Sequence, residues 1–205
     1  NKYMHLLYGV SAMTIGVTGP SGAGKSLFCS MLAARGFCVL DCDRIYHEMI
    51  AAPGECTSEL AMRFGEGILD TAGGIDRSAL ADAVFKDKAA LGDLNRITHK
   101  YVADEVMARS AVAANAGIHV AIDAPLLFEA GLDGMCDLTV GILAPRGSRA
   151  ARLIERDGAS RTPEQLQARI NASRDDSYYT ERCSVTMMNN GDIDALGEFA
   201  DRIAA

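Results

Sequence analysis

The sequence contains the stretch Gly19-Pro20-Ser21-Gly22-Ala23-Gly24-Lys25-Ser26, which fits the pattern G-x-x-x-x-G-K-[ST]. Its glycines let the backbone turn tightly and direct several N–H groups at one point. Residues 13–18 before it form a β-branched run typical of a buried strand, and residues 27–35 after it are apolar at helical spacing. A helix N-terminus in this place favours an anion. The context predicts a phosphate-binding loop, with Lys25 on the β- and γ-phosphates and Ser26 on Mg²⁺.

The composition is that of a globular chain with no large basic surface. The 205 residues are 49% hydrophobic and carry a net charge of −7, which argues against broad binding to nucleic acid or to anionic membranes. The six cysteines form no C-x-x-C pair, so we expect no zinc site and a reduced, cytoplasmic protein. No apolar run reaches the length of a membrane helix. Residues 1–12 are expected to be an extension outside the fold.

Strands and helices are expected to alternate along most of the chain. Apolar runs predict further strands at residues 37–41, 119–123, 138–143 and 185–188. Helical spacing predicts helices at residues 44–52, 59–64, 78–85, 89–114, 149–156, 163–173 and 193–203. This alternation predicts an α/β fold of three layers, with a five-stranded parallel sheet flanked by helices. Residues 55–115, which contain no convincing strand, are expected to form a helical insertion.

Two acids follow expected strands. Asp43 comes shortly after the strand at 37–41, where a carboxylate can orient an acceptor hydroxyl and take its proton during phosphoryl transfer. The alternative is that Asp43 is the N-cap of the next helix. Asp123 ends the strand at 119–123, where nucleotide-binding folds place an acid near Mg²⁺; the alternative for it is a turn residue. The residues alone leave both pairs of alternatives open.

Arg149, Arg152 and Arg156 lie close together in the C-terminal third of the chain, and the last two share a helix face. Guanidinium groups are fixed bidentate donors to phosphate oxygens, so these arginines are candidates for binding phosphate. Glu155 and Asp157 lie among them. The same stretch is therefore also consistent with a solvated surface of ion pairs.

From residue 13 to the C-terminal helix the chain resembles the dephospho-coenzyme A kinase family. Besides the phosphate loop, the resemblance rests on Asp41-Cys42-Asp43, Phe64-Gly65, Ile75-Asp76-Arg77, Phe85, His99, Asp123-Ala124-Pro125-Leu126-Leu127-Phe128-Glu129, Arg152-Leu153-Ile154-Glu155-Arg156-Asp157 and Asn189-Asn190-Gly191. The phosphate loop alone would indicate only a superfamily. The D-x-P-L-L-F-E stretch, together with D-x-D after the second strand, is much more specific.

The resemblance implies a kinase that uses ATP and Mg²⁺ to phosphorylate the ribose 3′-hydroxyl of dephospho-coenzyme A. It implies one domain over residues 13–205, with a phosphate-loop kinase core at 13–54, 117–150 and 183–205, a helical coenzyme A-binding region at 55–116 and a lid at 151–182. A phosphate-loop kinase for another small acceptor remains an alternative. So does a nucleotide-dependent switch without an acceptor.

The resemblance also assigns roles to residues. Catalysis falls to Lys25, Arg152 and Asp43, which is the base for the 3′-hydroxyl. ATP would be bound by Gly22, Ala23, Gly24, Lys25, Ser26, Leu27, Arg156 and Asn189, with Ser26 on the metal and Asn189 near the adenine. The acceptor site would comprise Thr18, Asp43, Arg77, His99, Asp123, Leu126, Phe128 and Glu129. Leu27 stands where the family usually has threonine, so it cannot donate a hydroxyl to the α-phosphate.

Overall fold

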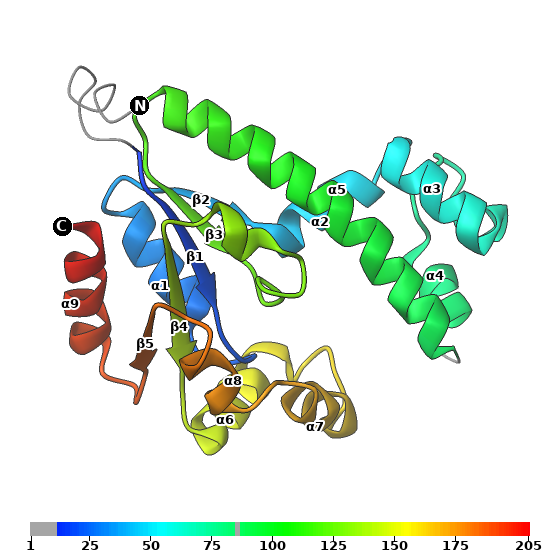
Figure 1. Ribbon diagram of the computed structural model, residues 1–205. Helices are drawn as coiled ribbons and strands as arrows, with labels where there is room; N and C mark the ends of the chain where they lie inside the picture. The colour runs from blue at the N-terminus through cyan, green and yellow to red at the C-terminus, as the bar shows by residue number, and fades with distance from the viewer. Residues whose placement is uncertain (1–11, 85–86) are drawn as a thin grey trace. The chain divides into compact units, whose positions relative to one another are not determined.

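The computed structural model describes residues 12–84 and 87–205 (Figure 1). The expected extension, apart from its last residue, and Phe85 lie outside these ranges. The chain divides into two compact units. One contains the described residues up to Leu40 together with Ser110–Ala205, and the other is Asp41–Arg109.

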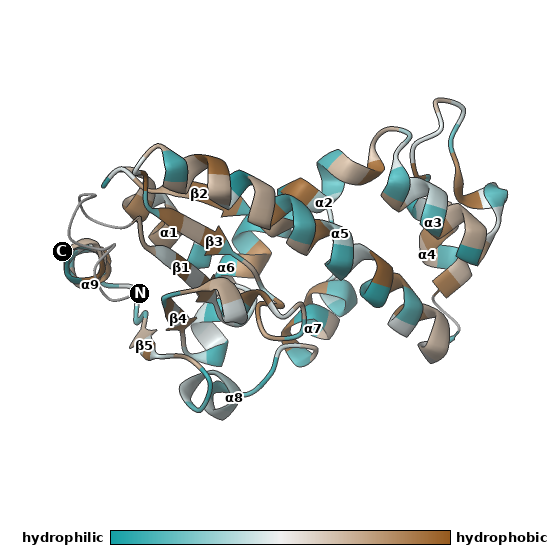
Figure 2. Ribbon diagram, turned by 45° about the horizontal axis from the view of Figure 1, so that its top comes forward, coloured by the Kyte–Doolittle hydropathy of each residue, from teal (hydrophilic) through white to brown (hydrophobic). Residues whose placement is uncertain are grey.

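The first unit is built on the predicted five-stranded parallel sheet. Its strands, in the spatial order β2-β3-β1-β4-β5, are β2 Cys38–Asp41, β3 Val120–Asp123, β1 Thr14–Thr18, β4 Leu138–Leu143 and β5 Val185–Met188. Most of their residues carry the brown of hydrophobic side chains in Figure 2, as expected for a sheet covered on both faces. The central strand β1 leads directly into the phosphate loop, so this loop starts at the carboxyl edge of the sheet, where open α/β sheets bind ligands.

Helices of the same unit pack on the sheet or on one another. They are α1 Lys25–Ala33, α6 Arg146–Asp157, α7 Pro163–Asn171, α8 Asp176–Thr180 and α9 Ile193–Ala204, with the short 3₁₀ helix η3 at Leu132–Met135. Helices α1 and α9 share one buried cluster with β1 and β4, in which the rings of Phe28 and Phe199 lie 5.5 Å apart. On the outside, Arg35 Nε donates a hydrogen bond of 2.7 Å to Asp201. These contacts hold α1, and with it the end of the phosphate loop, against the sheet.

The second unit is helical, as predicted. It contains α2 Cys42–Ile50, α3 Glu55–Phe64, the 3₁₀ helix η2 Glu66–Ile68, α4 Arg77–Val84 and most of α5 Lys88–Asn115. Ile50, Leu60, Ile75, Leu80 and Ile97 form its buried core. Because Ile50 of α2 packs in this core, α2 groups with the helical unit, whose first residue is Asp41 rather than residue 55.

Three helix starts differ from the sequence-based expectation. Helix α2 is capped by Asp41, whose side chain accepts a hydrogen bond of 3.0 Å from the backbone of Arg44, so the interpretation of Asp43 as the N-cap is wrong. Helix α3 begins one turn earlier than predicted, because Thr57 accepts a hydrogen bond of 2.8 Å from the backbone N–H of Gly54 and so caps the start of the helix. Helix α6 also begins earlier, at Arg146, directly after Pro145.

Candidate active site

The phosphate loop has the backbone that its glycines were expected to provide. Gly19, Gly22 and Gly24 have φ angles of 141°, 80° and 102°, a region that favours glycine. The loop also packs too closely for side chains, since a Cβ on Gly19 would lie 2.1 Å from the carbonyl oxygen of Ile142. A Cβ on Gly22 would lie 2.7 Å from the carbonyl oxygen of Arg149. The loop is thus fixed between β4 and α6.

Cationic side chains hold the carbonyl groups of this loop. Lys25 Nζ donates to Gly19 O at 2.9 Å, and Arg152 Nη1 lies 3.3 Å from the carbonyl oxygens of both Gly22 and Ala23. Hydrogen bonds from charged groups are usually 2.7–2.9 Å long, so the contacts of Arg152 are loose. Both cations therefore lie beside the loop, within reach of a phosphate bound there.

Asn189, which follows β5, ties the loop to the sheet. Its side-chain nitrogen Nδ2 donates a buried hydrogen bond of 2.8 Å to Ala23 O, and its Oδ1 accepts one of 3.1 Å from the backbone of Gly191. Arg152 Nη2 lies 3.4 Å from the same Oδ1. Asn189 was predicted beside adenine; the structure gives it a supporting role in the loop, which the sequence did not reveal.

A recess opens over the loop. It is lined by Gly22, Gly24, Lys25, Ser26, Leu27, Arg152, Leu153 and Arg156. Seven of these eight residues are among those that the sequence assigned to ATP binding or catalysis, and Leu153 is the addition. The recess combines loop backbone with three cationic side chains, which is a suitable environment for a polyphosphate.

Ser26, which lines this recess, lies close to Asp123. Ser26 Oγ lies 3.5 Å from Asp123 Oδ2, so a hydroxyl and a buried carboxylate lie side by side. Hard oxygen ligands of this kind suit Mg²⁺, which usually takes one or two protein ligands, phosphate oxygens and water. The described residues contain no group of three or more His, Cys, Asp or Glu side chains that could hold a metal by themselves. Thr18 Oγ1 donates nearby to Pro125 O at 3.3 Å.

Asp157, at the end of α6, gathers three arginines. It accepts hydrogen bonds of 2.7 and 2.9 Å from Arg156, and Arg169 and Arg161 approach it at 3.2 and 3.9 Å. The hydrogen bond from Arg156 is the main cause that lowers the pKa of Asp157. Arg169 Nε also lies 3.4 Å from Ser21 Oγ in the phosphate loop. The alternative of an ion-pair surface therefore describes Arg156 in this structure, whereas Arg152 contacts the loop. Sequence reasoning missed Arg169.

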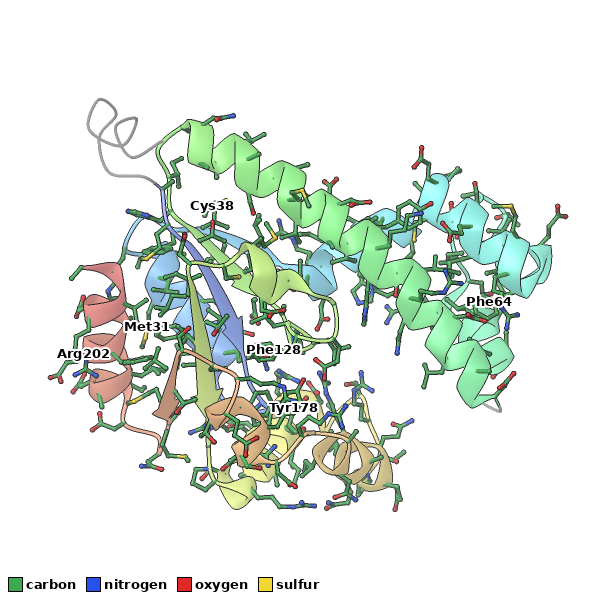
Figure 3. The ribbon with its side chains drawn as sticks, viewed as in Figure 1. Met31, Cys38, Phe64, Phe128, Tyr178 and Arg202 are labelled. Atoms are coloured by element: carbon green, nitrogen blue, oxygen red, sulfur yellow. The ribbon has the colours of Figure 1, made fainter. Side chains whose placement is uncertain are left out.

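The segment after Asp123 contacts α8. The ring of Phe128 meets the ring of Tyr178 edge to face, with centroids 6.1 Å apart, and both are labelled in Figure 3. Glu129 accepts a hydrogen bond of 2.9 Å from the hydroxyl of Tyr178 and lies 3.7 Å from Arg174. Leu126 is exposed. The sequence predicted the segment as part of the acceptor site but gave no signal for its contact with Tyr178.

The remaining predicted acceptor residues belong to the helical unit. Asp43 lies exposed in the first turn of α2, and Arg77 is the exposed first residue of α4. Arg77 acts electrostatically on Tyr46, where it opposes the burial that raises the pKa of this tyrosine. His99 is half-buried on α5. That these residues belong to the acceptor site stays a prediction.

A parallel sheet, a phosphate loop after its central strand and arginines over that loop define a phosphate-loop kinase fold. A sequence model described as Dephospho-CoA kinase matches residues 13–195, so the chain belongs to the dephospho-CoA kinase family. This confirms the resemblance seen in the sequence.

Individual relatives agree with this assignment. The dephospho-CoA kinase of Corynebacterium efficiens is 34% identical over 194 residues, which cover 94% of this chain and 96% of the relative. Among solved structures, TT1252 from Thermus thermophilus has a TM-score of 0.77 and 28% identity over 95% of this chain and 97% of its own. A dephospho-CoA kinase from Campylobacter jejuni has a TM-score of 0.61 at 20% identity over 95% and 96% of the chains, which supports the fold alone.

Proposed function

We propose that this chain transfers the γ-phosphoryl group of ATP to the ribose 3′-hydroxyl of dephospho-coenzyme A, which gives coenzyme A and ADP. This is the final step of coenzyme A synthesis. The observation that carries the proposal is the recess in which the phosphate loop, Lys25, Arg152 and Arg156 come together in a chain of this family. We place the reaction in the cytoplasm, without a nucleic-acid or membrane partner. Within the described residues, no helix combines the length and the apolarity needed to cross a bilayer.

ATP would lie on residues 22–27, with its phosphates against the loop backbone. Lys25 neutralises charge on the β- and γ-phosphates, while Arg152 and Arg156 approach from α6. Ser26 and Asp123 would hold Mg²⁺, which supplies positive charge to the β- and γ-phosphate oxygens when it is bound. Asn189 keeps Ala23 in place and lies on the side of the loop where we place the adenine.

Asp43 is the proposed general base. It accepts the proton of the 3′-hydroxyl while the ribose oxygen bonds to the γ-phosphorus, and the bond from this phosphorus to the bridging oxygen of ADP breaks. The carboxylate is exposed, and no hydrogen bond ties it to another of the described side chains. Thr18, Arg77, His99, Asp123, Leu126, Phe128 and Glu129 complete the proposed acceptor site.

A direct test measures ADP formation with dephospho-coenzyme A, with nucleoside monophosphates, and with no acceptor. We expect rapid ADP formation only with dephospho-coenzyme A, and one phosphate at the 3′ position of the product. Faster turnover of a nucleoside monophosphate would instead favour a kinase for another acceptor. Slow hydrolysis that no acceptor accelerates would favour a nucleotide switch.

The role of Asp43 is tested by Asp43→Asn, with Asp41→Asn as the matched control. Both variants remove one exposed carboxylate from the start of α2, and asparagine caps a helix as well as aspartate does. We expect kcat of Asp43→Asn to fall by about 10²–10⁴, as is typical when a general base is removed. Asp41→Asn should remain within about twofold of wild type. Equal turnover in the two variants would exclude Asp43 as the base.

A further inference from the structure

Arg149 is a buried arginine whose guanidinium group has unpartnered nitrogens in the described part of the chain. The residue is only 6% exposed, and within the described part of the chain its Nε and Nη1 atoms have no hydrogen-bond partner. Its backbone is fixed, because the carbonyl oxygen of Arg149 packs directly against Gly22 of the phosphate loop. Arginine stays ionised in proteins, so Arg149 cannot escape this situation by losing its proton.

A buried charge with unused donors is unfavourable unless an anion completes it. The arginines that follow on α6 have partners: Arg152 contacts loop carbonyls, and Arg156 pairs with Asp157. The carboxylate of Glu129 is engaged by Tyr178 and Arg174. Arg149 therefore differs from these neighbours, because two of its guanidinium nitrogens have no partner among the described residues.

Arg149 lies outside the recess over the phosphate loop and within electrostatic reach of Tyr179. It is not among the eight residues that line the recess over the phosphate loop, whereas Arg152 and Arg156 are. Instead, Arg149 acts electrostatically on Tyr179 of α8, which is only 4% exposed. Burial raises the pKa of this tyrosine to about 12. Arg149 opposes that rise, and Glu129 adds to it. Arg149 and Glu129, the last residue of the 123–129 segment, therefore both lie within electrostatic reach of the Tyr179 hydroxyl.

We propose that Arg149 and the hydroxyl of Tyr179 bind a phosphate group of the acceptor, namely the diphosphate of dephospho-coenzyme A. The inference rests on the proposed function and adds the residues that distinguish this acceptor from an unphosphorylated nucleoside. Donors on two different guanidinium nitrogens suit an anion that presents several oxygens. A nucleotide phosphate has the same chemistry, so the test must separate the two sources.

The test compares Arg149→Met with wild type and with Arg146→Met, an exposed arginine on the same helix. Steady-state kinetics with dephospho-coenzyme A and with adenosine as acceptors are combined with calorimetric binding of a non-hydrolysable ATP analogue. For Arg149→Met we expect KM for dephospho-coenzyme A to rise by about 10- to 150-fold, the effect of losing hydrogen bonds to a charged group. Formation of 3′-AMP from adenosine, binding of the ATP analogue and all parameters of Arg146→Met should stay within about twofold of wild type.

Tyr179→Phe provides a second variant that keeps the packing if Arg149→Met fails to fold. It removes only the hydroxyl, and we expect KM for dephospho-coenzyme A to rise several-fold with kcat and ATP binding unchanged. An unchanged KM for dephospho-coenzyme A in the folded variants would overturn the proposal. So would a loss of affinity for the ATP analogue, which would assign Arg149 to the nucleotide, or an equal loss with adenosine. Failure of the proposed function itself would be seen separately, as absence of dephospho-coenzyme A turnover in the wild type.

Discussion

Asn189 is distant from the phosphate loop in the sequence but supports it through hydrogen bonds, and the strength of this support can be predicted. Asn189→Ala removes the bond of 2.8 Å to Ala23 O and the bond of 3.1 Å from the backbone of Gly191. Each such bond contributes about 1 kcal/mol net. Ala23 O keeps Arg152 at 3.3 Å, and Gly191 is exposed to water, so neither group is left buried without a partner. We therefore expect a loss of about 2 kcal/mol in the free energy of unfolding.

For a chain of this length, that loss corresponds to a decrease of about 4–8 °C in Tm. The measurement is a thermal melt followed by circular dichroism, with calorimetric binding of ATP to the folded variant. Asn190→Ala is the matched control, because its side chain is exposed and its substitution should change stability by less than about 0.5 kcal/mol. ATP should bind more weakly to Asn189→Ala, since the loop is less firmly held. Equal melting temperatures and equal ATP affinities in the two variants would refute the reasoning.

Other variants test other parts of the site. Lys25→Ala should lower kcat by about 10²–10³ with Tm nearly unchanged, because Lys25 supplies charge for the transferring phosphate; near-normal turnover would contradict the assignment. Gly19→Ala should destabilise the fold more than Gly36→Ala in urea denaturation, since both have positive φ but only a Cβ on Gly19 meets a backbone oxygen, at 2.1 Å. For Asp157, whose folded-state pKa is lowered, ionisation stabilises the fold above the unfolded pKa of about 3.9, and this contribution disappears as pH falls through the folded pKa. The Tm difference between wild type and Asp157→Asn should thus reach its full size at about pH 6 and shrink toward zero in acid. A Tm difference that does not change with pH would contradict this role of Asp157.

The sequence predicted the sheet and most helices because both have local signals. Apolar runs marked every strand, and Pro163 marked the start of α7 because proline suits the first position of a helix. Helix α8 gave no such signal. It has five residues, too few to show helical periodicity, and two of them are tyrosines, which favour strands.

The site was predictable where one motif contains its chemistry and unpredictable where contacts are long-range. The loop could be read from residues 19–26, but the bond from Asn189 to Ala23 spans 166 positions and depends on the sheet order. Arg149 was expected to share the role of its neighbours. Its burial depends on how closely α6 approaches Gly22, which helix periodicity does not specify.

The different partners of Arg152 and Arg156 suggest how the site would exchange protein contacts for phosphate contacts. Arg152 is held by contacts of 3.3–3.5 Å, which are long for a charged donor, so phosphate oxygens can replace them at little cost. Arg156 must leave a bidentate pair with Asp157 at 2.7 and 2.9 Å. Asp157 would not then remain unpaired, because Arg169 lies 3.2 Å away and Arg161 3.9 Å away. Asp157 thus serves as an anionic partner that orders these arginines and can release one of them to a nucleotide.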